Sequence, residues 1–266
     1  MHFDPNMRTI LTVLCLLLLL AVYVAAACAS NRRHRRWPHC RIGCWLLGLL
    51  CFSWSVAGPI SSHAHHSFAS HMLVHLLLGM LSPLFIALAK PVTLLLRTVG
   101  RKAARSVSRL LRSRPFAFIS SPINASVLHV GGLWLLYGTE LYGLMHAYSW
   151  LYVLVHIHLF AAGYLFTVSI LQLEPSAHPR SLPYRMTVFM LASAAHAVLA
   201  KSLYAHPPVH VTAEDAASGS MLMYYGGDLA ELIMLTLLFS AWYRARTRRL
   251  SASIVHAGQP PNPRYS

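Results

Sequence analysis

Five polar side chains in apolar surroundings have types and spacings that suit metal binding. His71 and His75 are four residues apart, and Asp228 and Glu231 are three apart, so each pair shares one face of a helix. Neutral imidazoles at that spacing can bind one transition metal through two nitrogens. Carboxylates in an apolar bundle need a cation, a metal or an opposing charge. His156, in another apolar stretch, completes the predicted set of metal ligands.

The elements that carry these residues are long apolar segments. Of the 266 residues, 56% are hydrophobic and 11% are charged, with a mean hydropathy of +0.52. A membrane-spanning helix needs about 20 mostly apolar residues, and none of the segments alternates as a membrane β-strand would. The sequence therefore predicts an all-α integral membrane protein with one seven-helix domain over residues 1–245. The predicted spans are 10–29, 42–60, 66–89, 122–145, 149–171, 184–205 and 221–243.

Basic residues fix the expected orientation. The chain has 22 Lys and Arg against 7 Asp and Glu, a net charge of +15, and 20 of the 22 follow the first, third, fifth and seventh spans. Cytoplasmic loops collect such residues, so we expect the N-terminus outside and the C-terminus in the cytoplasm of a plasma-membrane protein. A cleaved signal peptide over the first span would put the following arginines on the wrong face. Basic runs between apolar stretches argue against nucleic-acid binding.

Two further segments bear on this organisation. Residues 246–266 form a cytoplasmic tail that is Pro-rich near its end and is expected to be disordered. Cys40 and Cys44 are four apart and could bind a soft metal, although small side chains packed within a helix are the favoured interpretation.

The estimated depths of the ionisable groups below the outer ends of their spans place them in one layer, in the outer half of the membrane. With a rise of about 1.5 Å per residue, the depths are roughly 8 Å for His71 and Glu140, roughly 10 Å for His156 and Asp228, roughly 14 Å for His75, and roughly 15 Å for His196 and Glu231. Lys201 is a candidate partner for the carboxylates. Interhelical hydrogen bonding is the alternative for each pair, and it is favoured for His129, His158 and His196.

The residues 71–83, HMLVHLLLGMLSP, and 90–97, KPVTLLLR, resemble the CtaG family of assembly proteins for caa3-type cytochrome c oxidase. Residues 156–166 resemble the histidine-bearing fifth helix of that family, and residues 224–231, YYGGDLAE, are similar to a form found in some members. The resemblance spans roughly residues 60–245. Two family positions differ, because Tyr152 replaces a histidine and Leu136-Tyr137 replaces a Trp-His pair.

The resemblance implies a non-enzymatic membrane assembly factor for a haem–copper oxidase. It implies copper handling on the outer side, with a copper-bearing oxidase subunit and the lipid bilayer as partners. Imidazole and thioether donors suit copper, and Met72, Met80, Met145, Met221 and Met223 could supply the thioethers.

Two other functions remain open at this stage. A copper importer would use the same ligands. A b-type haem protein could use His75 and His156 as axial ligands. A retinal protein would need a lysine in the last span, which has none, and no GxSxG or HExxH motif indicates a hydrolase.

Overall fold

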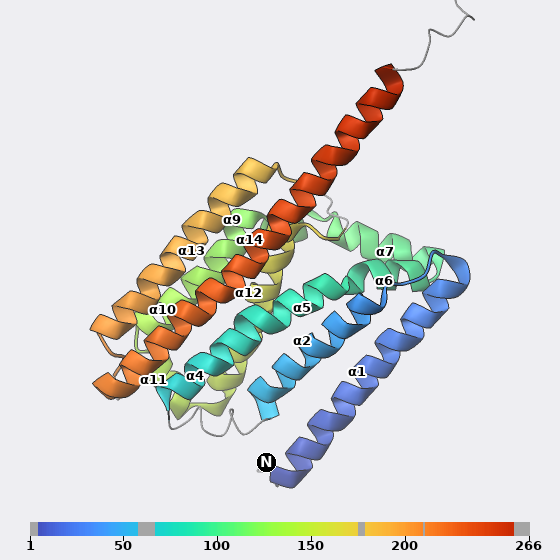
Figure 1. Cartoon of the computed structure of the whole chain (residues 1–266). Coiled ribbons are helices and arrows are strands. Elements are labelled where there is room, and N and C mark those ends of the chain that lie inside the picture. Colours follow the sequence, from blue (N-terminus) through green and yellow to red (C-terminus); the bar gives the residue numbers. More distant parts are fainter. Residues whose placement is uncertain (1–4, 58–66, 175–178, 210, 258–266) are drawn as a thin grey trace, which may run out of the picture.

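The computed structural model describes residues 5–57, 67–174, 179–209 and 211–257, and these residues form helices without any strand (Figure 1). The elements are α1 (Pro5–Arg33), α2 (His39–Ala57), α4 (Phe68–His75), the π-helix η1 (Leu76–Leu81), α5 (Ser82–Ala89), α6 (Pro91–Thr98), α7 (Arg101–Leu111), α8 (Arg114–Ile119), α9 (Pro122–Ser126), the π-helix η2 (Val127–Gly131), α10 (Gly132–Gly138), α11 (Leu141–Ala147), α12 (Ser149–Leu171), α13 (Leu182–Ala205) and α14 (Ala213–Ala257).

Six helices in the described part of the chain are long and apolar enough to cross a membrane, so the protein is an all-α, multi-pass membrane protein. They are Thr9–Arg33, His39–Ala57, Phe68–Thr98, Ser149–Leu171, Leu182–Ala205 and Ala213–Thr247. These helices match six of the seven predicted spans, although the predicted boundaries at residues 58–60 and 66 lie outside the described residues. The seventh crossing and the orientation remain predictions.

The predicted span 122–145 is not one uninterrupted helix. The segment α9–η2–α10 runs from Pro122 to Gly138, and the chain then turns extended at Thr139 before α11 begins. The Thr139 hydroxyl donates to the carbonyl of Leu135 and accepts from the amide of Leu141. Local bonds of this kind compete with a helical backbone, which explains why an apolar stretch of sufficient length ends early.

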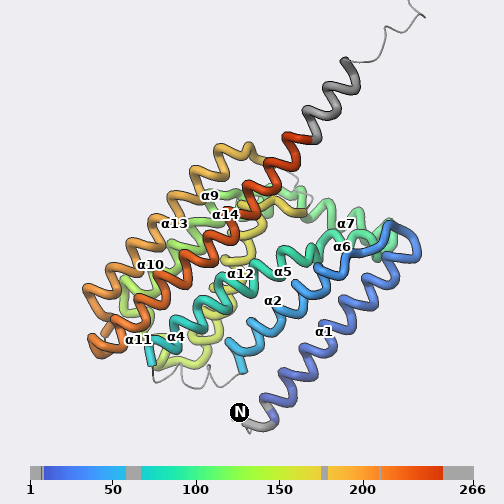
Figure 2. The backbone as a smooth tube through the Cα atoms, viewed as in Figure 1, coloured from blue at the N-terminus to red at the C-terminus, as the bar shows by residue number. Residues whose placement is uncertain are grey.

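The basic segments gather at one end of the bundle. The α1–α2 connection, α6 to α8, the α12–α13 connection and the C-terminal part of α14 lie at this end, while the start of α4, α11 and the α13–α14 connection lie at the other (Figures 1 and 2). Helix α1 runs along the edge of the bundle and exposes leucines such as Leu11, Leu14 and Leu18. Such an apolar, outward-facing surface is what a lipid-facing helix requires.

The predicted disordered tail is partly helical. Helix α14 continues to Ala257, and only residues 258–266 of the tail lie outside the described residues. Residues 241–257 contain no Gly or Pro and include four alanines and four arginines. These residue types favour helix, so α14 continues beyond residue 246 to Ala257.

A π-helical turn shapes the third span. Pro83 has no amide hydrogen to give to the carbonyl of Gly79, and the chain widens into η1 just before it. A Cβ atom on Gly163 of α12 would lie 2.0 Å from the Gly79 oxygen. Only glycine therefore permits α12 to pack against this turn, and the contact holds α12 beside the helix that carries His71 and His75.

Candidate functional site

Helix α4 places His71 and His75 in the interior, where both are almost fully buried. Its N-terminus is capped by Ser67, whose hydroxyl accepts from the amide of Ser70. Asp215 of α14 adds to this cap, because its carboxylate accepts from the amides of Phe68 and Ala69 at 2.6 and 3.1 Å. A carboxylate at a helix N-terminus is favoured by both the hydrogen bonds and the helix dipole. The start of the histidine-bearing helix is therefore fixed to α14.

His71 belongs to an aromatic cluster near the predicted outer end. Its Nε2 lies 3.0 Å from the hydroxyl of Tyr137. Its ring centroid lies 6.3 Å from that of His156 and 6.1 Å from that of His146. The ring of Tyr142 lies closer still, at 5.2 Å. Helices α4, α10, α11 and α12 thus bring three imidazoles and two phenols together.

The backbone sets the tautomer of His156. Its Nδ1 lies 2.8 Å from the carbonyl oxygen of Tyr152, and a carbonyl can only accept, so Nδ1 carries the proton. In the neutral ring, Nε2 is then the deprotonated nitrogen. His146 has the same arrangement with the carbonyl of Tyr142, at 2.9 Å. This is the usual way in which proteins prepare a histidine as a metal ligand.

His75 faces a different partner. Its ring lies 6.0 Å from that of His196 on α13, with the two planes 29° apart. The Nδ1 of His196 lies 3.6 Å from the Glu231 carboxylate of α14. Within the described part of the chain, neither ring nitrogen of His75 has a hydrogen-bond partner, and the same holds for Nε2 of His196. Three helices therefore converge on a second, deeper group of His75, His196 and Glu231.

The two glycines of the α14 motif have packing roles here. A Cβ on Gly227 would lie 2.5 Å from the His196 ring, and one on Gly226 would lie 2.6 Å from the Leu76 side chain. The absence of side chains lets α14 lie close to α4, η1 and α13. Glu231, one turn after Gly227, consequently reaches His196.

Asp228 does not share the surroundings of Glu231. Asp228 is exposed on the outer surface of α14, whereas Glu231 is half-buried against His196. Lys201 is also exposed, and its ammonium lies 5.1 Å from the ring centroid of Tyr224. The expected ion pair between Lys201 and Asp228 is not among the contacts of the described residues. A spacing of three residues spreads two side chains by about 60° around a helix, enough to separate an interior position from a surface one.

Four of the five predicted metal ligands fall into two groups, and the exposed Asp228 lies in neither. His71 lies with His156, and His75 lies with His196 and Glu231. No three His, Cys, Asp or Glu side chains converge as a ready metal-binding group anywhere in the residues that the structure describes. Met72, Met145 and Met223 are buried in the same apolar cluster as Tyr137 and Tyr142, which contact His71. The donor chemistry therefore fits a low-coordinate soft ion such as Cu(I) better than a tetrahedral or octahedral one.

His158 and His129 have structural surroundings. The Nε2 of His158 lies 3.1 Å from the carbonyl of Leu128, within the π-helix η2, and its ring fills the space beside Gly132. His129 stacks on Phe166 at 5.2 Å. Glu140 is exposed where α10 gives way to α11.

Sequence reasoning missed the tyrosines of the site. Tyr137 contacts His71, and Tyr152 stacks on His156 with ring centroids 4.0 Å apart. Both occupy the positions where the sequence departs from the CtaG pattern, which was the signal that could have revealed them. Asp215 was also missed, because its role depends on a contact with a segment almost 150 residues away.

A cavity of about 380 Å³ reaches His156. This residue belongs to the histidine layer, by which we mean His71, His75, His156 and His196. The cavity lies between α2, η1 and α12, and His156 forms part of its wall together with Phe52, Leu78 and Phe160. The cavity is lined mostly by apolar side chains.

Comparison with known proteins agrees with this architecture. The sequence matches the family model of the cytochrome c oxidase caa3 assembly factor (Caa3_CtaG) over residues 21–245. It is 34% identical over 169 residues to the uncharacterized proteins Mb0105 of Mycobacterium bovis and MT0111 of Mycobacterium tuberculosis, and 29% identical over 176 residues to ML1998 of Mycobacterium leprae.

These alignments cover 61% of this chain for the first two relatives and 64% for the third. They cover 25%, 25% and 26% of the relatives, so the chain spans about a quarter of their length. No solved structure matches the chain. The family match extends over most of the sequence, including every helix that contributes to the histidine layer. The chain belongs to the family of cytochrome c oxidase caa3 assembly factors.

Proposed function

We propose that the protein assists maturation of caa3-type cytochrome c oxidase in the plasma membrane by holding copper as cargo among the histidines of the outer half of the bundle. The copper-bearing subunit of the oxidase is the proposed recipient. The protein acts in this scheme as an assembly factor and not as a catalyst, since copper is received and passed on unchanged.

The observation that carries the proposal is the environment of His75. This imidazole is 1% exposed, and neither of its nitrogens has a hydrogen-bond partner in the described part of the chain. Leaving a buried polar group unsatisfied costs about 1–3 kcal/mol. An ion that accepts the nitrogen lone pair would remove this cost, and the neighbouring His196 ring offers a second nitrogen.

The chemistry of the surroundings supports copper over harder ions. Imidazole nitrogens and methionine sulfurs are soft or borderline donors, and the site offers few oxygens besides Glu231 and the tyrosine hydroxyls. A site with few ligands also suits transient binding, because the cargo must leave. The pairs His71–His156 and His75–His196 provide two neighbouring positions for one ion.

The geometry favours this role over the alternatives. A b-type haem held by His75 and His156 would need those two rings to face each other, whereas His75 faces His196 and His156 faces His71. An importer would need polar groups beyond His129, and the next layer is the apolar cluster around Leu84, Ile170 and Leu238.

Metal analysis of the full-length protein tests the proposal. Purified protein loaded with Cu(I) should retain copper, and His75→Ala should lower the affinity at least about tenfold, since second-shell losses alone cost that much. His71→Ala and His156→Ala should also reduce copper retention and oxidase activity in cells.

The matched control is His158→Ala, which removes an imidazole two residues from His156 that bonds only to a backbone carbonyl. It should leave copper retention unchanged. Wild-type copper retention in His75→Ala, or equal losses in His156→Ala and His158→Ala, would contradict the proposal and favour a packing role.

A further inference from the structure

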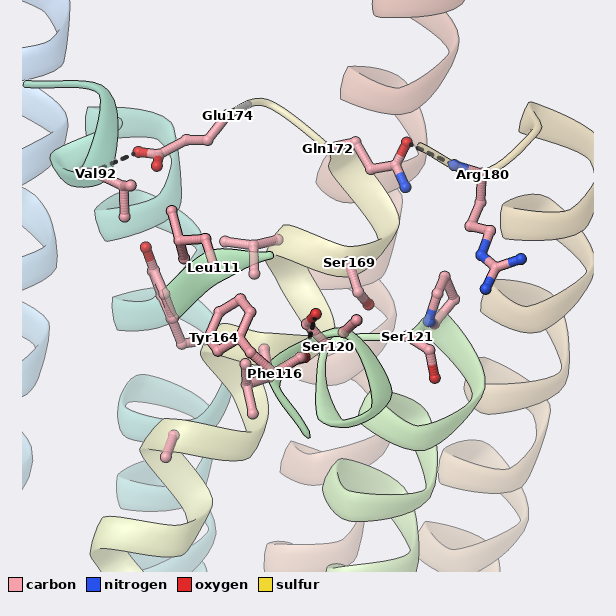
Figure 3. Close-up of a pocket in the computed structure, with 15 residues that line it drawn as sticks. Val92, Leu111, Phe116, Ser120, Ser121, Tyr164, Ser169, Gln172, Glu174 and Arg180 are labelled. Atoms are coloured by element: carbon pink, nitrogen blue, oxygen red, sulfur yellow. Dashed lines mark hydrogen bonds between the residues drawn. The ribbon is translucent and has the colours of Figure 1, made fainter. Parts of the chain in front are cut away.

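A second cavity lies at the opposite end of the molecule from the histidine layer. It has a volume of about 470 Å³ and is bounded by α7, α8 and the second half of α12 (Figure 3). This size is within the range of about 300–1,000 Å³ that is usual for small-molecule sites. The histidine proposal does not use it, and nothing in this inference depends on copper.

The cavity is lined mostly by apolar side chains and a few serines, and its charged groups are Glu174 and Arg180. Leu111, Phe116, Leu165 and Val168 supply apolar surface. Figure 3 shows Glu174 and Arg180 on opposite sides of the view, with Gln172 and Ser169 between them and with Leu111, Tyr164 and Phe116 below Glu174. A ligand that fits must therefore combine a long apolar part with a polar end.

Helices α7 and α8, which border the cavity, expose both basic and apolar side chains. On α7, the half-buried residues Ala104, Val107 and Leu111 lie on one face, and Arg101, Lys102, Arg105 and Arg109 are exposed. Leu110, Phe118 and Ile119 beside the cavity are exposed as well. Exposed apolar and basic side chains together are typical of a helix lying in the lipid interface. The apolar part of the ligand can enter from the bilayer.

The charged residues at the opening of the cavity determine which polar group of a ligand can bind there. Neither α7 nor α8 contains an acidic residue, and Arg180 on the rim is exposed, with its guanidinium 5.9 Å from the ring centroid of Tyr184. Glu174 is the acidic residue among those lining the cavity, but its carboxylate already accepts from the amide of Val92 at 3.1 Å. Burial raises the pKa of Glu174 to about 7, so this side of the rim is only partly charged near neutral pH. The field at the opening is positive.

We propose that this cavity binds one anionic phospholipid of the inner leaflet, with an acyl chain between α8 and α12 and the phosphate at Arg180. Basic pockets between helices on the cytoplasmic side are suited to anionic headgroups. The bound lipid fills the space between the amphipathic helices and α12. It thereby fixes the basic segment α7–α8 to the bundle.

Lipid retention by the full-length protein tests this. The protein is purified in mild detergent and titrated with phosphatidylglycerol or with phosphatidylcholine of the same chains, and bound lipid is counted by native mass spectrometry. One phosphatidylglycerol per chain should be retained in preference to phosphatidylcholine. Arg180→Gln should weaken phosphatidylglycerol about tenfold, because a charge-assisted hydrogen bond is lost, and leave phosphatidylcholine unchanged.

Two further variants separate a site from general surface charge. Ala117→Phe places a ring in the cavity and should abolish retention of either lipid, whereas Ala103→Phe, on the exposed face of α7, should not. Arg101→Gln removes a charge outside the cavity and should have no effect on retention. Equal retention of the two lipids, equal effects of Arg180→Gln and Arg101→Gln, or a second protein chain at the cavity in place of lipid would overturn the proposal.

Discussion

Glu231 and Asp228 are near neighbours on α14, yet only Glu231 contacts a histidine of the site. The Glu231 carboxylate lies 3.6 Å from His196 Nδ1, whereas Asp228, about 60° around the same helix, is exposed. A carboxylate that orients a ligating imidazole is worth about tenfold to a hundredfold in metal affinity. The exposed carboxylate has no such contact to lose.

We therefore predict that Glu231→Gln lowers copper affinity about tenfold, while Asp228→Asn leaves it unchanged. Each substitution preserves size, so the comparison isolates the carboxylate. Copper titration of the two purified variants measures the difference. A larger loss from Asp228→Asn than from Glu231→Gln would show that the exposed carboxylate takes part instead.

Glu174 gives the fold a pH dependence at the end of the bundle that carries the basic helices. Burial raises its pKa from 4.5 to about 7, and the amides of Val92 and Thr93 and the charges of Lys90 and Arg41 only partly oppose this. The folded protein thus binds this proton more tightly than the unfolded chain does. Its contribution to stability is complete below the unfolded pKa of 4.5 and is lost as the pH rises through about 7.

We predict that the thermal stability of the detergent-solubilised protein falls between pH 5 and pH 8, roughly the interval from the unfolded to the folded pKa. Glu174→Gln, which cannot ionise, should flatten that part of the profile. The matched control is Glu214→Gln, an exposed carboxylate at the start of α14. A profile that is the same in the wild type and in Glu174→Gln would contradict the prediction.

The sequence identifies which residues have unusual surroundings better than it identifies their partners. His71, His75 and His156 are buried as expected, because an imidazole in an apolar span must face the protein interior. Their grouping differs from the expectation that His71 and His75 face one common site, since His71 lies with His156 and His75 lies with His196. Depth along a helix follows from residue number, whereas rotation about the helix axis depends on contacts such as Gly227 against His196.

At the scale of elements, the third span and α12 are held together where Gly163 of α12 packs against the carbonyl of Gly79. Pro83 leaves the Gly79 carbonyl without its helical donor, and Gly163 lies against this oxygen. Because His75 is four residues before Gly79 and His156 is seven before Gly163, the contact fixes the relative height of both histidines.

We predict that Gly163→Ala destabilises the protein by about 1–3 kcal/mol, as other overpacked contacts do, and weakens copper binding as well. The added Cβ would lie 2.0 Å from a backbone oxygen, so the helices must separate. Gly143→Ala in α11 is the matched control, since its Cβ would meet nothing within 4 Å. That change should be neutral or stabilising by about 0.5–1 kcal/mol. Equal unfolding temperatures for the two variants would contradict the proposed role of the contact.

Hydropathy predicts the presence of the helices but not their interruptions. The break at Thr139 arises from a hydroxyl that bonds to nearby backbone groups, and the widening at η1 arises from Pro83. A single Thr or Pro changes the mean hydropathy of such a segment only slightly, and the third span still reaches 2.2. Conversely, α14 continues past the apolar stretch because arginine and alanine favour helix even where they do not favour lipid.

At the scale of the whole molecule, the two proposed sites lie at opposite ends of one bundle. The segments rich in Arg and Lys share the end that holds the lipid cavity, and the capped start of α4 marks the other end (Figure 1). The charge pattern of the sequence anticipates this segregation, although it takes the folded chain to bring four separate basic segments together. The orientation of the bundle in the membrane then decides which side receives copper.

We predict that the end near Ser218 faces outward and the end near Ser106 faces the cytoplasm, because basic segments are retained on the cytoplasmic side. Both serines are exposed, so each can be replaced by cysteine in a variant that lacks the five native cysteines. In intact cells, a membrane-impermeant maleimide should label Ser218→Cys and should spare Ser106→Cys. Both should react after detergent solubilisation, which controls for accessibility. The reverse labelling pattern would invert the bundle, placing the histidine layer in the inner half and the lipid cavity in the outer leaflet. Both the delivery of copper from outside and the choice of an inner-leaflet lipid would then have to be abandoned.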